Sequence, residues 1–172
     1  WVFKPRISES NHPTITPLMT SDRVRSRETE GVQTADTGAR GDRKIYPWLS
    51  VITPVKDALP QLTRTWESLQ SQDLAGVEWV IIDSSRDPQE VPPLLSGLPN
   101  VTYSWQAPQG VFPAMNRGIT ESTGQYVYFL NAGDTLAGAD SLSELHDALV
   151  RLGHPAWAFA DVEMFDDQGR PH

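Results

Sequence analysis

Residues 49–72 of the chain, LSVITPVKDALPQLTRTWESLQSQ, decide the fold. Leu49–Thr53 is a short apolar run rich in β-branched residues that ends at Pro54, which predicts a buried strand. Asp57 is placed to cap the helix that follows. The apolar residues of that helix recur at offsets of 0, 3, 7 and 10, the spacing of one helix face, at Leu59, Leu62, Trp66 and Leu69.

The alternation of strand and helix continues along the chain. Further strands are predicted at residues 77–82, 101–105, 125–130 and 156–165. Helices are predicted from Asp87-Pro88 toward Leu95, over 112–122 with Gly124 as the C′ residue, and from Asp140 along Leu142, Leu145, Leu149 and Leu152 to Gly153. Such alternation indicates βαβ units, and therefore an α/β fold with a mostly parallel sheet and helices on both faces. Ligands of such sheets bind beyond the carboxyl ends of the strands.

The charge of the chain changes sharply near residue 47. Residues 1–46 carry 8 Lys+Arg and 6 Asp+Glu, whereas residues 47–172 carry 6 and 16, within a net charge of −8. The first part is poor in apolar residues and its middle has no helical or strand period. We therefore predict a disordered leader or linker at 1–46 and one folded domain at 47–172. The alternative for the leader is a basic arm that binds a membrane surface or a partner through Arg23, Arg25 and Arg27.

Composition also excludes several classes of function. The chain has no Cys, which excludes disulfides, thiolate zinc sites and Cys nucleophiles. A net charge of −8 argues against nucleic acid as a partner, because phosphate backbones attract Lys and Arg. The motifs of dehydrogenases, P-loop NTPases and α/β-hydrolases are absent. The sequence starts at Trp1 rather than Met and stops at His172 just after a predicted turn, so we expect a fragment truncated at its C-terminus.

Polar side chains gather where the predicted strands end. The first strand is followed by residues 54–57 (PVKD), the second by Asp83 and the fourth by residues 131–134 (NAGD). A carboxylate at such a place can accept hydrogen bonds from a ribose or a base, and one beside a flexible Gly can hold a divalent metal. The alternative for each segment is a plain turn, since the same residues favour turns. Arg117 is either a solvated charge on its helix or a contact to a phosphate.

Three collinear segments over roughly residues 47–138 resemble glycosyltransferase family 2. The segment LSVITPVKDALPQLTRTWESLQSQ resembles its opening strand, followed by T-P-x-x-N or T-P-x-x-D and a helix with S-L-x-x-Q. VEWVIIDSSRD resembles its second strand, E-x-I-I-x-D-x-x-S-x-D. QGVFPAMNRGITESTGQYVYFLNAGDTL resembles G-I-Y-D-A-M-N-x-G-I followed by F-L-N-S-G-D, the form typical of the colanic-acid or exopolysaccharide branch.

The resemblance implies a GT-A fold, which is a Rossmann-like, mostly parallel sheet, and a nucleotide-diphosphate-sugar donor. It implies that Asp134 binds a divalent metal, Mg²⁺ or Mn²⁺, and that Asn131 is a weaker ligand. The residues implied in donor binding, for base, ribose or phosphate, are Pro54, Val55, Asp57, Asp83, Arg117 and Asn131. It further implies transfer to a glycan or lipid-linked acceptor in surface-polysaccharide assembly, in the cytoplasm at the inner face of the membrane, with peripheral membrane association.

The chain also departs from the family pattern. Ser84-Ser85-Arg86 stands where the family often has a small loop with Gly, and Pro113 stands where the G-I-Y-D-A-M-N form has Asp. No residue is assigned as the general base, which is expected beyond residue 172, and Asp161 is an outside candidate for an acceptor-side contact. We therefore expect this fragment alone to be inactive. Two rivals stay open: a nucleotidyltransferase on a similar sheet, and a degenerate or incomplete nucleotide-binding domain without transferase activity.

Overall fold

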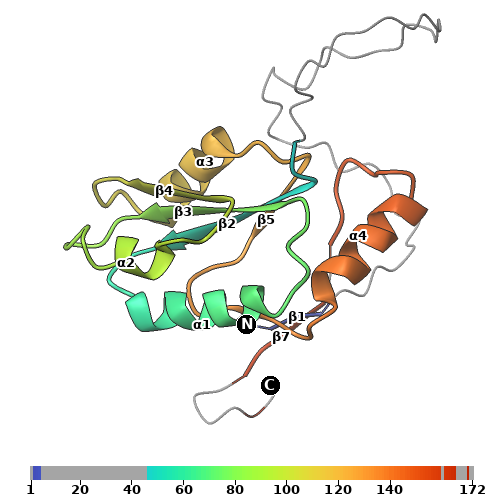
Figure 1. Cartoon of the computed structure of the whole chain (residues 1–172), viewed down its shortest axis with the longest axis horizontal. Helices are drawn as coiled ribbons and strands as arrows, with labels where there is room; N and C mark the ends of the chain where they lie inside the picture. Colours follow the sequence, from blue (N-terminus) through green and yellow to red (C-terminus); the bar gives the residue numbers. More distant parts are fainter. Residues whose placement is uncertain (1, 5–45, 160, 166–169, 171–172) are drawn as a thin grey trace, which may run out of the picture. The chain divides into compact units, whose positions relative to one another are not determined.

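The computed structural model describes residues 2–4, 46–159, 161–165 and 170 (Figure 1). The chain divides into two units, and the unit described below consists of Trp1–Ile7 and Ile45–His172. Most of the leader predicted over 1–46 therefore lies outside the described residues, as does the predicted turn at 166–169. Within the predicted leader, Val2–Lys4 form a strand, β1.

A four-stranded sheet forms the centre of this unit (Figure 1). Its strands lie in the order β4 (Val101–Trp105), β3 (Val77–Asp83), β2 (Leu49–Val55) and β5 (Tyr126–Phe129). All three neighbouring pairs are parallel, which confirms the predicted α/β sheet. The chain moves outward from β2 to β4 and then returns to the other side of β2 as β5. A reversal of this kind marks the place where ligands of such sheets bind.

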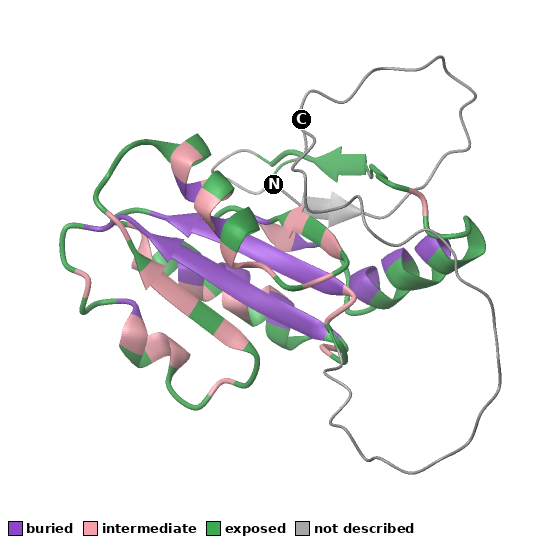
Figure 2. Ribbon diagram, turned by 90° about the horizontal axis from the view of Figure 1, so that it is seen from above, coloured by how far each residue is buried: buried purple, intermediate pink, exposed green. Residues whose placement is uncertain are grey.

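Helices cover both faces of the sheet, as predicted (Figure 1). On one face, α1 (Leu59–Gln70) and α4 (Ser141–Arg151) bury their apolar stripes in the larger core cluster, with the short α2 (Pro92–Leu95) beside it. On the other face, α3 (Val111–Glu121) packs through Ala114 on a smaller cluster of β2 and β3 residues. Figure 2 shows β2 and β3 buried along their whole length, because both of their faces are covered.

The periodic residues of α1 and α4 face the core as the spacing predicted, except Leu152, which follows the end of α4 at Arg151 and is 40% exposed. The buried ones are Leu62, Leu69, Leu142, Leu145 and Leu149. Trp66 is half-buried and stacks on Trp79 of β3, with ring centroids 5.3 Å apart and planes within 11°. An offset aromatic pair of this kind adds to the area that it buries, so it helps to fix α1 on the sheet.

Strand β2 runs two residues past the predicted end, through Pro54 to Val55. Proline lacks the N–H that a central strand needs. Here the carbonyl of Ile52 accepts the N–H of Leu130 on the β5 side, and the pairing of β2 with β5 ends at Ile52↔Phe129. Pro54 faces the same side two residues later, beyond the last pair, so no ladder hydrogen bond is lost. The prediction that Pro54 ends the strand was wrong for this reason.

The helix starts predicted at Asp87 and Asp140 differ in detail from those in the structure. Asp87 does not cap a helix, because its carboxylate accepts the N–H of Gln89 at 2.9 Å in a local turn and α2 begins only at Pro92. Asp140 does precede α4, but its side chain makes no capping hydrogen bond. Asp87 satisfies the backbone locally, which a short polar side chain does as readily in a turn as at a helix end.

The strand predicted over residues 156–165 is much shorter in the structure. Asp161–Glu163 form β7, which pairs antiparallel with β1, and β1 pairs parallel with β6 (Thr135–Leu136). Residues 156–159 form no strand, and the side chain of Trp157 is 69% exposed. The apolar composition of this segment suggested a buried strand, but β7 pairs with the three-residue strand β1 and is itself exposed.

A buried glutamate connects the amino-terminal ends of β2 and β3 to the residues that precede β5. Glu78 in β3 accepts hydrogen bonds from the hydroxyl of Ser50, from the N–H and hydroxyl of Thr123, and from the N–H of Gly124 at 3.1 Å. Burial raises the pKa of Glu78, but these hydrogen bonds outweigh it and hold the pKa below its ordinary value. The prediction of Gly124 as a C′ residue was wrong, because α3 ends at Glu121 with Ser122 as its C-cap. Gly124 packs closely on β2 instead, since a Cβ there would lie 2.7 Å from the backbone nitrogen of Ser50.

We predict that Glu78→Gln destabilises the fold by about 1–3 kcal/mol at pH 7, because an amide cannot accept all of these hydrogen bonds. Since the folded-state pKa is lowered, the stabilisation by Glu78 is complete above its ordinary pKa and is lost as the pH falls below it. Urea denaturation of both proteins at pH 7 and at pH 3 measures the difference. An equal difference at the two pH values would contradict the assignment.

Candidate functional site

The loops that follow β2 and β3 are joined at the carboxyl edge of the sheet. Asp57 donates its N–H to the Ser85 hydroxyl at 2.8 Å, and its carboxylate accepts the N–H of Arg86 at 2.9 Å. Its other oxygen lies 3.5 Å from Nε of Arg86. Asp57 has a φ of 48°, and the residue that precedes α1 is Ala58. The prediction of Asp57 as a helix cap was therefore wrong, since its side chain is used to hold the second loop.

Asp83 ends β3 and is completely buried. One carboxylate oxygen accepts the N–H of Ser85 at 2.7 Å, and the other accepts the hydroxyl of Tyr103 at 2.9 Å. Burial, and then the hydrogen bond and charge of Asp83, raise the pKa of Tyr103 above its ordinary value. The buried carboxylate of Asp83 thus holds the loop of residues 84–86 in place and is not exposed at this edge of the sheet.

The turn of residues 131–134 is fixed to α1 by a buried threonine. The hydroxyl of Thr65 donates to the carbonyl of Asp134 at 2.9 Å and accepts the N–H of Gly133 at 2.9 Å. Gly133 also donates to the carbonyl of Gln61, and its φ of 99° is one that other residues rarely adopt. Sequence reasoning predicted the turn but missed Thr65, whose only signal is a polar residue on the buried face of α1.

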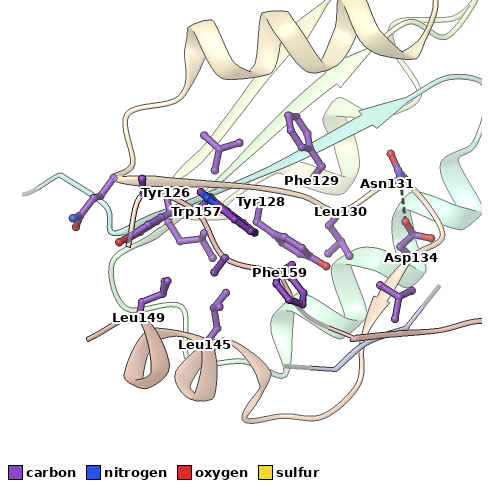
Figure 3. A pocket seen from close by; sticks show the side chains of 16 residues that line it. Tyr126, Tyr128, Phe129, Leu130, Asn131, Asp134, Leu145, Leu149, Trp157 and Phe159 are labelled. Carbon is purple, nitrogen blue, oxygen red and sulfur yellow. Dashed lines mark hydrogen bonds between the residues drawn. The ribbon is translucent and has the colours of Figure 1, made fainter. Parts of the chain in front are cut away.

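Asn131 and Asp134 face each other across this turn (Figure 3). The amide nitrogen of Asn131 donates to Oδ2 of Asp134 at 3.0 Å. Both residues line one end of a cavity of about 690 Å³ that runs along β5, and its wall includes Tyr128, Trp157 and Phe159. Burial, and then the negative charge of Asp134, raise the pKa of Tyr128 above its ordinary value.

These two side chains fit a divalent metal of the Mg²⁺ type in their donor chemistry. They supply one carboxylate and one amide oxygen within a single turn. Among the described residues there is no cluster of three or more His, Cys, Asp or Glu. Mg²⁺ commonly takes one or two protein carboxylates and completes its shell with phosphates and water. The pair suits a site that a phosphorylated ligand completes.

Arg117 is held away from this turn. Its Nε lies 2.7 Å from Oε1 of Glu121, one turn later on α3, and its Nη1 donates to the carbonyl of Trp105 at 2.7 Å. Glu121 also accepts the hydroxyl of Ser104. The guanidinium therefore fastens α3 to the end of β4, on the face of the sheet opposite α1. The structure does not bring Arg117 together with Asp134.

A second, smaller cavity lies where β2 and β3 end beside the start of α3. Its volume is about 190 Å³. Its lining contains the predicted residues Pro54 and Val55, together with Lys56, Ser84, Gly110 and Val111. Within the described residues, one hollow thus lies beside the turn of residues 131–134 and another at the ends of the central strands.

A parallel sheet in this strand order, with polar loops gathered at its carboxyl edge, defines a Rossmann-like α/β domain. The sequence profile of glycosyl transferase family 2 matches residues 50–157. The chain belongs to this family.

Two mycobacterial relatives agree with this assignment. The chain is 32% identical over 118 residues to an "Uncharacterized glycosyltransferase" of Mycobacterium tuberculosis, covering 66% of this chain and 45% of that protein. It is 29% identical over 103 residues to a "PGL/p-HBAD biosynthesis glycosyltransferase" of Mycobacterium bovis, covering 58% of this chain and 40% of that protein. The chain thus spans less than half the length of these relatives.

Solved structures of glycosyltransferases have the same fold. The mannosyltransferase PcManGT of Pyrobaculum calidifontis, in complex with GDP-Man and Mn²⁺, superposes with a TM-score of 0.53 at 23% identity, over 60% of this chain and 32% of that one. The S. aureus protein TarS 1–349, in complex with UDP-GlcNAc, gives a TM-score of 0.54 at 21% identity, over 60% and 31%. These likenesses confirm the GT-A fold. In the described part of the chain, no helix is long and apolar enough to cross a membrane.

We predict that Asp83→Ala destabilises the fold by about 1–3 kcal/mol, because the N–H of Ser85 loses its acceptor inside the protein and the hydroxyl of Tyr103 keeps only the carbonyl of Pro88. Asp83→Asn keeps the shape and one acceptor, and is expected to cost about 1 kcal/mol. Urea denaturation measures both. An alanine variant as stable as the asparagine variant would show that the buried contacts contribute little.

We also predict that Thr65→Val loosens the turn of residues 131–134, since valine has nearly the same shape but no hydroxyl. The amide of Gly133 should then exchange with solvent at least several-fold faster. Thr63→Val is the matched control, because the hydroxyl of Thr63 bonds only to Leu59 of its own helix. Hydrogen exchange measured by NMR decides the matter, and equal exchange rates in the two variants would remove Thr65 from the site.

Proposed function

We propose that this chain is the donor-binding part of a glycosyltransferase that takes a nucleotide-diphosphate sugar together with Mg²⁺ or Mn²⁺. The observation that carries the proposal is the turn of residues 131–134, in which Asn131 and Asp134 face each other at the carboxyl edge of a family 2 domain. Membership of the family makes the sugar donor the natural ligand of this edge. The GDP-Man and Mn²⁺ complex of PcManGT and the UDP-GlcNAc complex of TarS, both of the same fold, support it.

In this proposal the two hollows of the edge hold different parts of the donor. The small cavity bounded by Pro54 and Val55 takes the base, and Asp57 and Asp83 hold the loops that form it. The metal, when bound to Asp134 and Asn131, supplies positive charge to the diphosphate as it departs. Asp134 alone would repel that diphosphate, and a bound divalent cation would reverse the sign of the local field.

The larger cavity along β5 is the proposed place of the sugar and of the group that accepts it. Its aromatic lining, with Tyr128, Trp157 and Phe159, offers apolar surface beside the carboxylate of Asp134. We propose that the acceptor is a glycan or a lipid-linked sugar of surface-polysaccharide assembly, at the inner face of the membrane. The biosynthetic name of the M. bovis relative supports a glycoconjugate acceptor in general terms.

Inverting transfer needs a general base that removes the proton of the acceptor hydroxyl as it attacks the anomeric carbon. Asp161 of β7 is exposed and pairs through its backbone with Lys4, and no hydrogen bond aims its carboxylate at the turn of residues 131–134 among the described residues. We therefore propose no base within this chain. We expect the 172-residue chain to bind the donor without transferring its sugar.

The test is the binding of UDP and of GDP, by calorimetry, to the wild-type chain and to Asp134→Asn, each with Mn²⁺ and with EDTA. In the wild type, Mn²⁺ should tighten binding of the preferred diphosphate at least tenfold, since its charge would offset the repulsion between the carboxylate of Asp134 and the phosphates. Asp134→Asn is nearly isosteric and should remove most of that gain while the melting temperature stays close to the wild type.

The corresponding nucleoside serves as the control in the same titrations. It lacks phosphates, so it should bind both proteins equally, with or without metal. Equal enhancement by Mn²⁺ in the two proteins would remove Asp134 from the metal site, and no binding of either diphosphate would overturn the proposed function.

A further inference from the structure

The outer side of α3 carries a row of apolar residues that the core does not use. Phe112, Met115 and Ile119 recur at offsets of 0, 3 and 7, which places them on one stripe of the helix. Phe112 is 74% exposed, Ile119 is 42% exposed and Met115 is half-buried. The buried residues of the helix, Ala114 and Gly118, lie on a different stripe. Most of this row therefore lies outside the core.

The row faces the side of α3 that is nearer to β5 than to β4. On the opposite flank, Arg117 donates to the carbonyl of Trp105, and Glu121 accepts the hydroxyl of Ser104, so that flank faces β4. Residues two apart on a helix point about 160° away from each other, so Met115 faces away from β4. Because β4 and β5 are the two edges of the sheet, the row faces β5.

The side of β5 that lies below this row is not covered. Val127 pairs with Ser50 and Phe129 with Ile52, so both stand on the sheet face on which α3 packs. Figure 3 shows the side chain of Phe129 on this face and that of Tyr128 on the other. The side chains of Val127 and Phe129 are 40% and 36% exposed. The row on α3 is thus a ridge, and the bare face of β5 beside it is a floor.

The area of the ridge and the floor matches the need of a protein interface. Their exposed parts amount to roughly 400 Å² of apolar surface, since large apolar side chains bury about 150–250 Å² each. A standard interface buries about 800 Å² per partner, of which a little more than half is apolar. Ridge and floor together therefore supply nearly all the apolar area that one such interface needs.

A second copy of this chain fits the patch because the patch contains both a ridge and a floor. When a two-fold axis brings two α3 faces together, the ridge of each copy lies on the floor of the other, and every contact occurs twice. The two α3 helices then form one layer between the two sheets. A flat surface such as a lipid bilayer reaches the ridge but not the floor beside it.

We propose that this chain forms a two-fold dimer in which Phe112 and Ile119 of each copy pack on Val127 and Phe129 of the other. The ridge and the floor contain no charged residue, whereas each copy carries a net charge of −8. The charges repel the two copies at long range, and salt screens that repulsion. The dimer does not depend on the proposed function, because none of its contact residues is assigned to the donor or the metal.

The experiment is sedimentation velocity of the 172-residue chain from about 1 to about 200 µM, where mass action sets the fraction of dimer. The wild type should dimerise with a Kd of about 10 µM, because the apolar area suits a small interface. Sodium chloride should tighten the dimer. Ile119→Lys and Val127→Glu should each raise the Kd at least tenfold, since each substitution enters the interface twice.

A mixture of the two variants separates a broken interface from a broken fold. In one pairing of the mixture the introduced lysine meets the introduced glutamate, and the other Ile119–Val127 contact stays native. The mixture should therefore recover a dimer that neither variant forms alone. Phe112→Ser changes a side chain that lies mostly in solvent, so it should weaken the dimer while the melting temperature stays close to the wild type.

Val150→Lys is the matched control, because Val150 is 47% exposed on α4, which covers the other face of the sheet. It should leave the Kd unchanged. A wild type that stays monomeric throughout the range would overturn the proposal. So would a dimer that tolerates Phe112→Ser and Ile119→Lys, a dimer that only Val150→Lys weakens, or a mixture that stays monomeric.

Discussion

The parallel pairing of β2 with β3 is the interaction on which the rest of the structure depends. The two strands pair over seven residues each, and every one of those residues is buried. Because the strands are parallel and in register, Val55 and Asp83 end side by side, and their loops leave the sheet at the same point. The bonds of Asp57 to the second loop are possible only because of this register. A shift of one residue would turn each buried side chain to the other face.

A second constraint fixes the turn of residues 131–134, which follows β5 on the other side of β2. β5 pairs with β2 over only four residues, so the strand alone would hold the turn of residues 131–134 weakly. Helix α1 compensates through Thr65 and Gln61, which bond to the backbone of that turn. The position of Asp134 is therefore decided by a helix that lies about seventy residues earlier in the chain.

Much of this could be predicted from the sequence, because the signals are local. The alternation of β-branched runs with leucines on one helix face gives the strands, the helices and their order, and the polar residues at strand ends mark the edge. The motif residues Asn131 and Asp134 and the glycine between them are visible as a pattern, and the φ of Gly133 agrees with it.

The roles of single polar side chains could not be predicted in the same way, because they depend on partners far along the chain. Asp57 has the sequence of a helix cap and bonds to a loop 29 residues away. Glu78 sits in an apolar strand without any local sign of its partners near residue 123. Arg117 donates to the carbonyl of Trp105 at the end of another element, a contact that no local pattern indicates. Burial of Asp83 likewise depends on Tyr103, which belongs to another strand.

The two faces of the sheet are packed by separate clusters of side chains. Ile52, Val80, Ile82 and Ala114 form a small one under α3, and the larger one under α1 and α4 shares none of these residues. The cavity that contains Ser84 borders the first cluster, and the turn that contains Asp134 is anchored on the second. A substitution that reshapes one hollow need not disturb the other. Over evolution, the hollow at the ends of the central strands is thus free to change its shape while the turn of residues 131–134 keeps its own.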